Sequence, residues 1–198
     1  MILRSAPASP FGRKAKIAAA LLGVPLTVVD ADTMNPEDSI RRENPLGKIP
    51  TLVLDDGTTL FDSSVIVGYL DALAGGNRLL PAEIGPRFNA LRLEALADGL
   101  CEAALLQVYE NRWRDPAKHE RTWLDHQAGK VDRGLAALEA FPPEKPITVG
   151  HIGLACALGY LDLRFEGAWR AAHPALVAWL DDFAAEVPAF ETTRVKPV

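Results

Sequence analysis

Several residue types and segments that define common protein classes are scarce or missing in this chain. Only two cysteines occur among its 198 residues, and neither forms a Cys-X-X-Cys pair or a cluster with histidine. The spacings typical of a zinc site or a redox-active dithiol are therefore missing. No apolar run reaches the length of about 18 residues that a transmembrane helix needs. The composition predicts no metal site and no membrane segment.

Positive charge is also in short supply. The net charge is −5 and the pI is about 5.4, whereas a general nucleic-acid binder carries a basic face. We therefore expect no nucleic-acid partner. The opening residues MILRSAPASP lack the long apolar stretch of a signal peptide. This predicts a cytoplasmic protein in which Cys101 and Cys156 are buried, reduced thiols.

Apolar residues, by contrast, are plentiful. They make up 48% of the chain, which suffices for a sizeable core. The first part predicts a small α/β unit in the order β-α-β, polar loop, β-β-α. Ser9 is a typical N-cap, Pro10 suits the first helical position and Gly23 suits a helix end. Asp56-Gly57 predicts a hairpin turn. The predicted strands are 1–5, 26–30, 51–54 and 59–61, and the predicted helices are 9–22 and 62–74.

After Gly76 the pattern becomes helical. We expect helices over about 87–113, 116–140, 148–165 and 174–186, followed by an irregular tail. The third of these helices is apolar nearly all round, which is typical of a helix in the middle of a bundle. The sequence therefore predicts an α/β domain at 1–76, a linker at 77–86 and an all-helical domain at 87–198.

Two helix starts in the α/β unit, at Ser9-Pro10 and at Asp62-Ser63-Ser64, are candidate anion sites because their backbone N–H groups are free. The first helix also carries three cations near its N-terminus, where the helix dipole is already positive: Arg13, Lys14 and Lys16. Two hypotheses account for them. Either they help to hold a negative group from outside the chain, or they form a solvated face.

Three segments resemble the cytosolic glutathione S-transferase family: SPFGRKAKIAAALLGV, NPLGKIPTLVLDDGTTLFDSSVIVGYLD and TVGHIGLACALGYLD. The resemblance covers nearly the whole chain. It implies a thioredoxin-like N-terminal domain, a helical-bundle C-terminal domain and a homodimer. It also implies glutathione as co-substrate in the first domain and a small, apolar electrophile in the cleft between the domains.

The same resemblance assigns roles to five residues. Pro50 would follow a cis peptide bond, and the backbone of Ile49 would pair with the cysteinyl part of glutathione as an added strand does. Lys48 would face the glycyl carboxylate. Ser63 would hold the γ-glutamyl carboxylate, and Asp62 would either cap its helix or meet the γ-glutamyl amine.

Ser9 stands where the family places the residue that holds the glutathione sulfur. Some relatives have Cys-Pro-Phe here and carry out thiol–disulfide exchange. A serine hydroxyl forms no mixed disulfide, but it can donate a hydrogen bond to a thiolate, so Ser9 is the expected catalytic residue. Ser5, at the end of the first strand, and a backbone N–H group acting alone are the alternatives.

Three aromatic residues are candidates for the electrophile pocket, namely Phe11, Tyr109 and Trp113. Tyr109 and Trp113 lie four residues apart and share one helix face, although packing inside the bundle would account for them equally well. Asp98 is a further candidate, because some relatives extend a carboxylate across the dimer to the γ-glutamyl amine.

The chain departs from the family at the start of its central helix, where Thr148 and His151 stand in place of a Ser/Thr-X-X-Asp capping box. An imidazole can replace the carboxylate only if it is neutral and in the right tautomer. We therefore expect this helix start to be weaker by about 1 kcal/mol than one with aspartate, and His151→Asp to stabilise the protein.

The leading functional hypothesis is a glutathione S-transferase that ionises glutathione and conjugates it to an electrophile, typically in detoxification. One alternative is a non-catalytic binding or regulatory protein on the same scaffold, like the stringent-starvation proteins. Another is a different glutathione-dependent enzyme, such as a peroxidase, dehalogenase or isomerase. The retained residues Lys48, Ile49, Pro50 and Ser63 favour glutathione binding over its loss.

Overall fold

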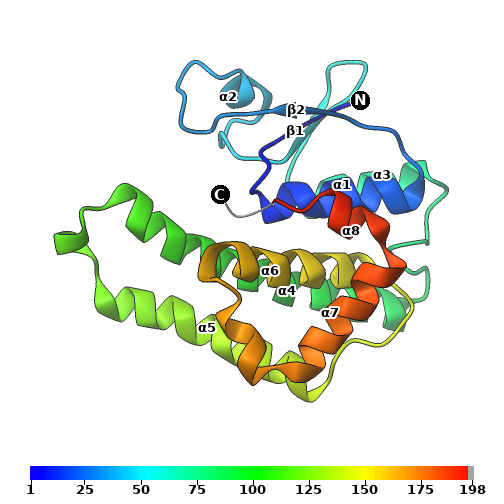
Figure 1. Ribbon diagram of the computed structural model, residues 1–198. Coiled ribbons are helices and arrows are strands. Elements are labelled where there is room, and N and C mark those ends of the chain that lie inside the picture. Colours follow the sequence, from blue (N-terminus) through cyan, green and yellow to red (C-terminus); the bar gives the residue numbers. More distant parts are fainter. Residues whose placement is uncertain (196–198) are drawn as a thin grey trace.

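A computed structural model describes residues 1–195 of the chain (Figure 1). The first half forms a four-stranded sheet in the order β2-β1-β3-β4, in which β1 is parallel to β2 and antiparallel to β3, and β3 is antiparallel to β4. The elements are β1 (Ile2–Ser5), α1 (Pro10–Leu22), β2 (Thr27–Asp30), α2 (Ile40–Glu43), β3 (Thr51–Val53), β4 (Thr59–Leu60) and α3 (Ser63–Leu73). The predicted thioredoxin-like domain is confirmed.

Helix α1 has the ends that its sequence predicts. The Ser9 hydroxyl oxygen accepts a hydrogen bond from the Gly12 N–H at 3.1 Å, and Pro10 occupies the first turn. Gly23 ends the helix with φ at 72°, a left-handed conformation that glycine adopts at little cost. The polar stretch at 31–42, which we expected to have no regular structure, contains the start of α2.

The second half is helical throughout its described part. Its elements are α4 (Ile84–Trp113), α5 (Arg121–Ala140), α6 (Val149–Phe165), α7 (Pro174–Glu186) and α8 (Pro188–Thr192), with short 3₁₀ turns η1 (Pro116–Lys118) and η2 (Ala168–Ala172). Helix α4 starts inside the segment 77–86 that the sequence predicts as a linker, and α8 lies in the tail expected to be irregular. None of the helices up to residue 195 is long and apolar enough to cross a membrane.

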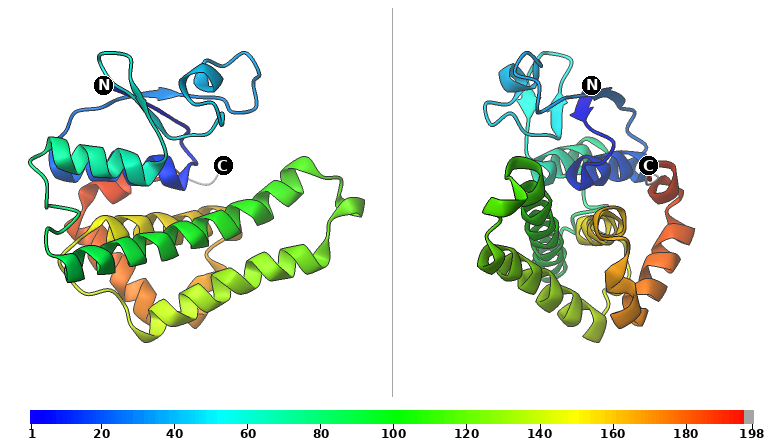
Figure 2. Two further views of the ribbon diagram at one scale, coloured as in Figure 1. Left: turned by 180° about the vertical axis from the view of Figure 1, so that it is seen from behind. Right: turned by 60° about the vertical axis from the view of Figure 1, so that its left-hand side comes forward.

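The two halves pack through α1 and α3, which lie between the sheet and the helical layer (Figures 1 and 2). Helix α6 is the central helix, as its apolar sequence predicts, and it is almost entirely buried from Val149 to Leu158. It crosses α4 so closely that a Cβ atom at Gly150 would lie 2.7 Å from the Ala90 carbonyl oxygen. Cys101 of α4 and Cys156 of α6 are both buried, as expected.

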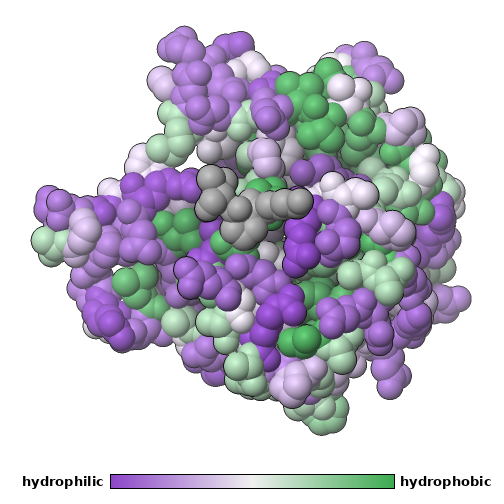
Figure 3. Space-filling model, in the orientation of Figure 1, coloured by the Kyte–Doolittle hydropathy of each residue, from purple (hydrophilic) through white to green (hydrophobic). Residues whose placement is uncertain are grey.

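The edge strand β2 is open to solvent. All four residues of β2 are exposed, and Figure 3 shows hydrophobic side chains gathered over β1 and β2, among them Ile2, Val28 and Val29. The exposure is confined to this edge of the sheet, because Leu3 and Arg4, which point to opposite faces of β1, are both buried.

His151 meets the condition under which an imidazole can cap α6. Its Nδ1 accepts hydrogen bonds from the backbone N–H and the hydroxyl of Thr148, at 3.3 and 2.9 Å. Its Nε2 lies 2.9 Å from the Glu144 carbonyl oxygen, and because a carbonyl can only accept, Nε2 carries the proton. The ring also packs beside Trp179. The imidazole is therefore neutral and replaces the carboxylate of the capping box.

This geometry reverses the expectation for His151→Asp. Aspartate would keep the cap but lose the bond to Glu144 and the packing on Trp179, so we expect a lower melting temperature and a loss of about 1 kcal/mol. Burial lowers the pKa of His151 from 6.5, and the bond to Glu144 opposes this only in part. The unfolded state therefore takes up the proton first as the pH falls.

The stability that wild type owes to this neutral ring is complete above pH 6.5 and declines as the pH falls from there towards the lower folded-state pKa. Urea unfolding of wild type and His151→Asp across this range measures both effects. An equal or higher melting temperature for His151→Asp at neutral pH would show that the bond to Glu144 contributes nothing.

Candidate functional site

The residues with predicted roles in the first domain meet at one end of the sheet. The register places Arg4 of β1 opposite Thr51 of β3, and Leu52 of β3 opposite Leu60 of β4. Because both pairs are antiparallel, the end of β1, the start of β3 and the end of β4 lie side by side. The loop to Ser9, the segment ending at Pro50 and the start of α3 therefore share this edge.

A cavity of about 340 Å³ lies beside the N-terminus of α1, where the sheet domain faces the helical domain. Three segments line it: the loop before α1 with the first turn of that helix, the later part of α6, and the end of α8 with the chain after it. The lining residues are Pro7, Ala8, Ser9, Pro10, Arg13, Cys156, Gly159, Tyr160, Asp162, Leu163, Glu191, Arg194 and Val195. Residues of both domains therefore contribute to the wall of the cavity.

Ser9 and Ser5 differ in accessibility. Ser9 lines the cavity and uses its oxygen as an acceptor for Gly12 N–H, so its hydroxyl hydrogen is left to donate. Ser5 is 1% exposed and does not line the cavity. Its Oγ lies so close under α1 that a Cβ atom at Gly12 would be 2.0 Å away. The geometry favours Ser9 as the donor to a bound sulfur.

The segment before β3 is held in a defined shape. The peptide bond between Ile49 and Pro50 is cis, as the resemblance implied. The Lys48 carbonyl oxygen accepts hydrogen bonds from Asn44 Nδ2 at 3.0 Å and Thr51 Oγ1 at 3.1 Å. The Lys48 side chain is exposed, whereas Pro50 is buried. The backbone is thus fixed while the lysine ammonium stays available to a ligand.

At the start of α3, Asp62 caps the helix by accepting hydrogen bonds from the N–H and hydroxyl of Ser64, at 3.1 and 2.6 Å. Burial works to raise the pKa of Asp62, but these bonds and the nearby Lys14 ammonium outweigh it, so the pKa lies below its ordinary value. Ser63 is 2% exposed at the first position of the helix. Of the two roles considered for Asp62, capping is the one that the structure shows.

Both hypotheses for the cations of α1 are wrong for Lys14, which is 1% exposed and pairs with Glu94 at 3.0 Å and Asp98 at 2.7 Å on α4. Burial alone would lower the pKa of Lys14, but the two carboxylates reverse this and raise it. Asp98 is therefore held within its own chain. Arg13 is also buried, against α8, and Lys16 is half-buried.

The aromatic candidates are not brought into this cavity. Phe11 is half-buried and packs against the core, and the Trp113 side chain is 62% exposed at the end of α4. Tyr109 is half-buried and carries the guanidinium of Arg112 over its ring. None of the three lines the cavity among the described residues, so their role in an electrophile pocket stays a prediction.

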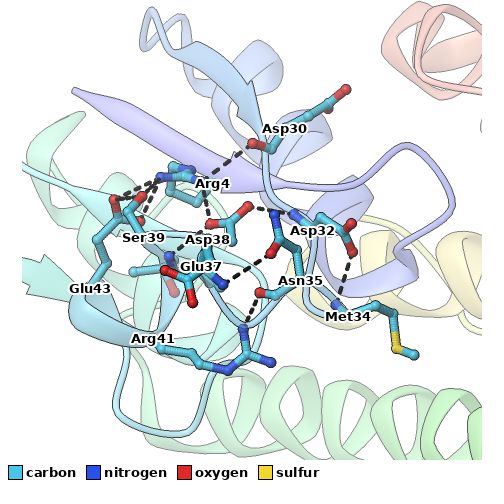
Figure 4. A network of polar contacts seen from close by, with 12 residues as sticks. Arg4, Asp30, Asp32, Met34, Asn35, Glu37, Asp38, Ser39, Arg41 and Glu43 are labelled. Atoms are coloured by element: carbon cyan, nitrogen blue, oxygen red, sulfur yellow. Dashed lines mark hydrogen bonds and ion pairs between the residues drawn. The ribbon is translucent and has the colours of Figure 1, made fainter.

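One polar network near the site was not foreseen. Arg4, inside β1 and 9% exposed, binds Asp38 at 2.9 Å, Ser39 at 2.6 Å and Glu43 at 2.7 Å, and so ties α2 to the sheet (Figure 4). The residue after Glu43 is Asn44, which holds the Lys48 carbonyl. The only signal in the sequence was a single arginine within a short apolar strand.

Replacing Arg4 with methionine would leave the partly buried carboxylates of Asp38 and Glu43 without their cation. We expect a loss of about 1.5–3 kcal/mol, the range for hydrogen bonds to charged groups, together with faster amide exchange over residues 44–48. Asp38→Asn is the matched control, because it weakens one contact and leaves Glu43 paired. Unchanged exchange over 44–48 in Arg4→Met would contradict the link from Arg4 to this segment.

Comparisons with known proteins agree with this geometry. Residues 3–78 match the model of the glutathione S-transferase N-terminal domain, and residues 121–182 match that of the C-terminal domain. The uncharacterised GST-like protein YibF of Escherichia coli K12 is 31% identical over 180 residues, 88% of this chain and 89% of YibF. The chain belongs to the glutathione S-transferase family.

Two solved structures of a glutathione transferase family member from Pseudomonas fluorescens Pf-5 are similar over the whole chain. The one with bound glutathione has a TM-score of 0.91 at 39% identity and covers 100% of this chain and 99% of its own. The one with bound S-(propanoic acid)-glutathione has a TM-score of 0.88 at 40% identity and covers 100% of both chains. In both of these structures the bound molecule is glutathione or a conjugate of glutathione.

Proposed function

We propose that this protein is a glutathione transferase that binds glutathione at the end of the sheet formed by β1, β3 and β4. The single observation that carries the proposal is the convergence of Ser9, the cis Ile49-Pro50 bond and Ser63 at that edge, beside an interdomain cavity. The backbone of Ile49 pairs with the cysteinyl part, Lys48 meets the glycyl carboxylate, and Ser63 with its helix N-terminus receives the γ-glutamyl carboxylate.

The chemical task of the protein is to ionise the thiol. A free alkyl thiol has a pKa of about 8.5, and lowering it by about 2 units requires about 2.7 kcal/mol of preferential stabilisation of the thiolate. A charge-assisted hydrogen bond from Ser9 supplies about 1.5–3 kcal/mol, and the N-terminus of α1 about 0.3–2 kcal/mol. These two contributions together suffice.

The thiolate then attacks an electrophile bound in the cavity between α1, α6 and α8. A carbon–sulfur bond forms, the leaving group departs or the acceptor takes up a proton, and the proton released from the thiol goes to solvent. We further propose that the protein works as a homodimer in the cytoplasm and serves in detoxification.

Binding to immobilised glutathione, followed by a panel of conjugation, peroxidase, dehalogenase and isomerase assays, tests the proposal. Retention on the column and conjugation that depends on Ser9 are expected. Failure to bind glutathione would contradict the proposal and favour a regulatory protein on the same scaffold. Retention with only peroxidase, dehalogenase or isomerase activity would replace the transferase reaction with that one.

A further inference from the structure

Arg13 is a buried guanidinium on the wall of the cavity. It is 7% exposed and is fixed from one side by α8 and the chain after it. Its Nη2 donates a hydrogen bond to the Phe190 carbonyl, and its Nε donates one to Thr193 Oγ1 at 3.2 Å. The guanidinium carbon, Cζ, lies 4.0 Å from the centre of the Phe190 ring. Thus Nε and Nη2 are occupied, and the group is held in one orientation.

The remaining nitrogen, Nη1, lies against Gly159 of α6. A Cβ atom at position 159 would be 2.4 Å from Nη1, so only glycine leaves room for the guanidinium here. Arg13 and Gly159 both line the cavity. Within residues 1–195 no hydrogen bond donated by Nη1 is found, and Nη1 is not one of the described polar atoms that are sealed from solvent without a partner.

The other charged residues on the cavity wall already have partners. Asp162 pairs with Arg170 at 2.6 Å and accepts from Trp169 Nε1 at 2.9 Å. Glu191 pairs with Arg194 at 3.2 Å. Among the described residues, Arg13 is therefore the charged group on this wall without an ion pair of its own, and the charges of Glu191 and Asp162 act on it only from a distance. A buried charge of this kind is costly unless a counter-charge is supplied.

We propose that the cavity binds small electrophiles that carry a carboxylate, which pairs with Arg13 Nη1 at Gly159. This inference rests on the proposed function, because Ser9 lines the same cavity and would hold the thiolate that attacks the reactive carbon. The carboxylate fixes the orientation of the electrophile, and the unpaired donor makes an uncharged analogue a poorer substrate.

A matched pair of substrates tests this directly: a chloronitrobenzoate and the chloronitrobenzamide with the same ring substitution. In both, the thiolate forms a carbon–sulfur bond and chloride leaves. The quantity measured is kcat/KM for the acid divided by kcat/KM for the amide, each corrected for its uncatalysed rate. In wild type we expect this ratio to be about ten, the effect of one modest charged contact. Arg13→Met should lower this ratio to about one, and Arg13→Lys should give a value between one and that of wild type.

Two further variants keep the test decisive if Arg13→Met folds poorly. Gly159→Ala displaces Nη1 and should also reduce the ratio. Arg164→Met, an exposed arginine on the same helix that does not line the cavity, should leave it unchanged. Two results would overturn the inference. One is a ratio that falls to one in Arg194→Met but not in Arg13→Met, and the other is a ratio of one in wild type.

Calorimetric binding of the chloronitrobenzoate without glutathione separates this inference from the proposed function. If glutathione is not bound but the benzoate binds through Arg13, the proposed function fails and the anion site stands. If glutathione is conjugated to both substrates equally well, the proposed function stands and the anion site fails.

Discussion

Replacing Lys14 with methionine is expected to destabilise the protein by about 3–5 kcal/mol, the cost of removing one partner from a buried ion pair. Glu94 and Asp98 would then face each other at the domain interface with no cation between them. Burial raises the pKa of Glu94 more than Lys14 lowers it, and the neighbouring charge of Asp98 adds to the rise. Urea unfolding at neutral pH measures the change.

Lys16→Met is the matched control, since Lys16 lies on the same helix and no ion pair to it is found within residues 1–195. We expect that variant to change stability by about 0.5 kcal/mol or less, because removing the half-buried Lys16 leaves no carboxylate without its cation. Adding Glu94→Gln and Asp98→Asn to Lys14→Met should recover part of the loss. If Lys14→Met and Lys16→Met unfold alike, the buried ion pairs do not hold the domains together.

Removing the Ser9 hydroxyl with Ser9→Ala is expected to lower kcat/KM for glutathione conjugation by about 10–100-fold. The physical reason is the loss of a charge-assisted hydrogen bond of about 1.5–3 kcal/mol to the thiolate. The rate at saturating concentrations of both substrates is the measurement that separates this effect from weaker binding. An unchanged rate would leave the backbone N–H groups as the sole stabilisers of the sulfur.

Two controls separate the loss of the hydrogen bond to sulfur from a loss of folded protein. Ser9 also caps α1, so its replacement costs about 0.5–2 kcal/mol of stability, and the rate must be measured where the variant is fully folded. Ser5→Ala removes the other hydroxyl that the sequence offered. Because Ser5 is buried away from the cavity, we expect that variant to keep its rate.

The parts of the fold that local chemistry determines could be predicted from the sequence. Ser9, Pro10 and Gly23 specify the ends of α1 through their own hydrogen bonds and backbone angles, and these predictions are confirmed. The apolar sequence of α6 placed it at the centre of the bundle. By contrast, α2 and α8 are short helices whose formation depends on contacts with distant residues, such as Arg4 and Arg13.

The same distinction applies to the site. A cation at the start of a helix has several possible partners, and the sequence cannot say which side of α1 meets α4 or α8. The resemblance therefore indicated the edge of the sheet at which we propose that glutathione binds, but it could not show that Lys14 and Arg13 belong to the domain interface. For His151 the sequence left the tautomer open, because the tautomer depends on the Glu144 carbonyl seven residues away along the chain.

The pKa of the thiol of bound glutathione tests the central claim most directly. It is measured by titrating the ultraviolet absorbance of the thiolate in the complex, for wild type and for Ser9→Ala. We predict a value about 2 units below the 8.5 of a free thiol in wild type, and a rise of at least about 1 unit in Ser9→Ala. A wild-type value equal to that of free glutathione would contradict the account.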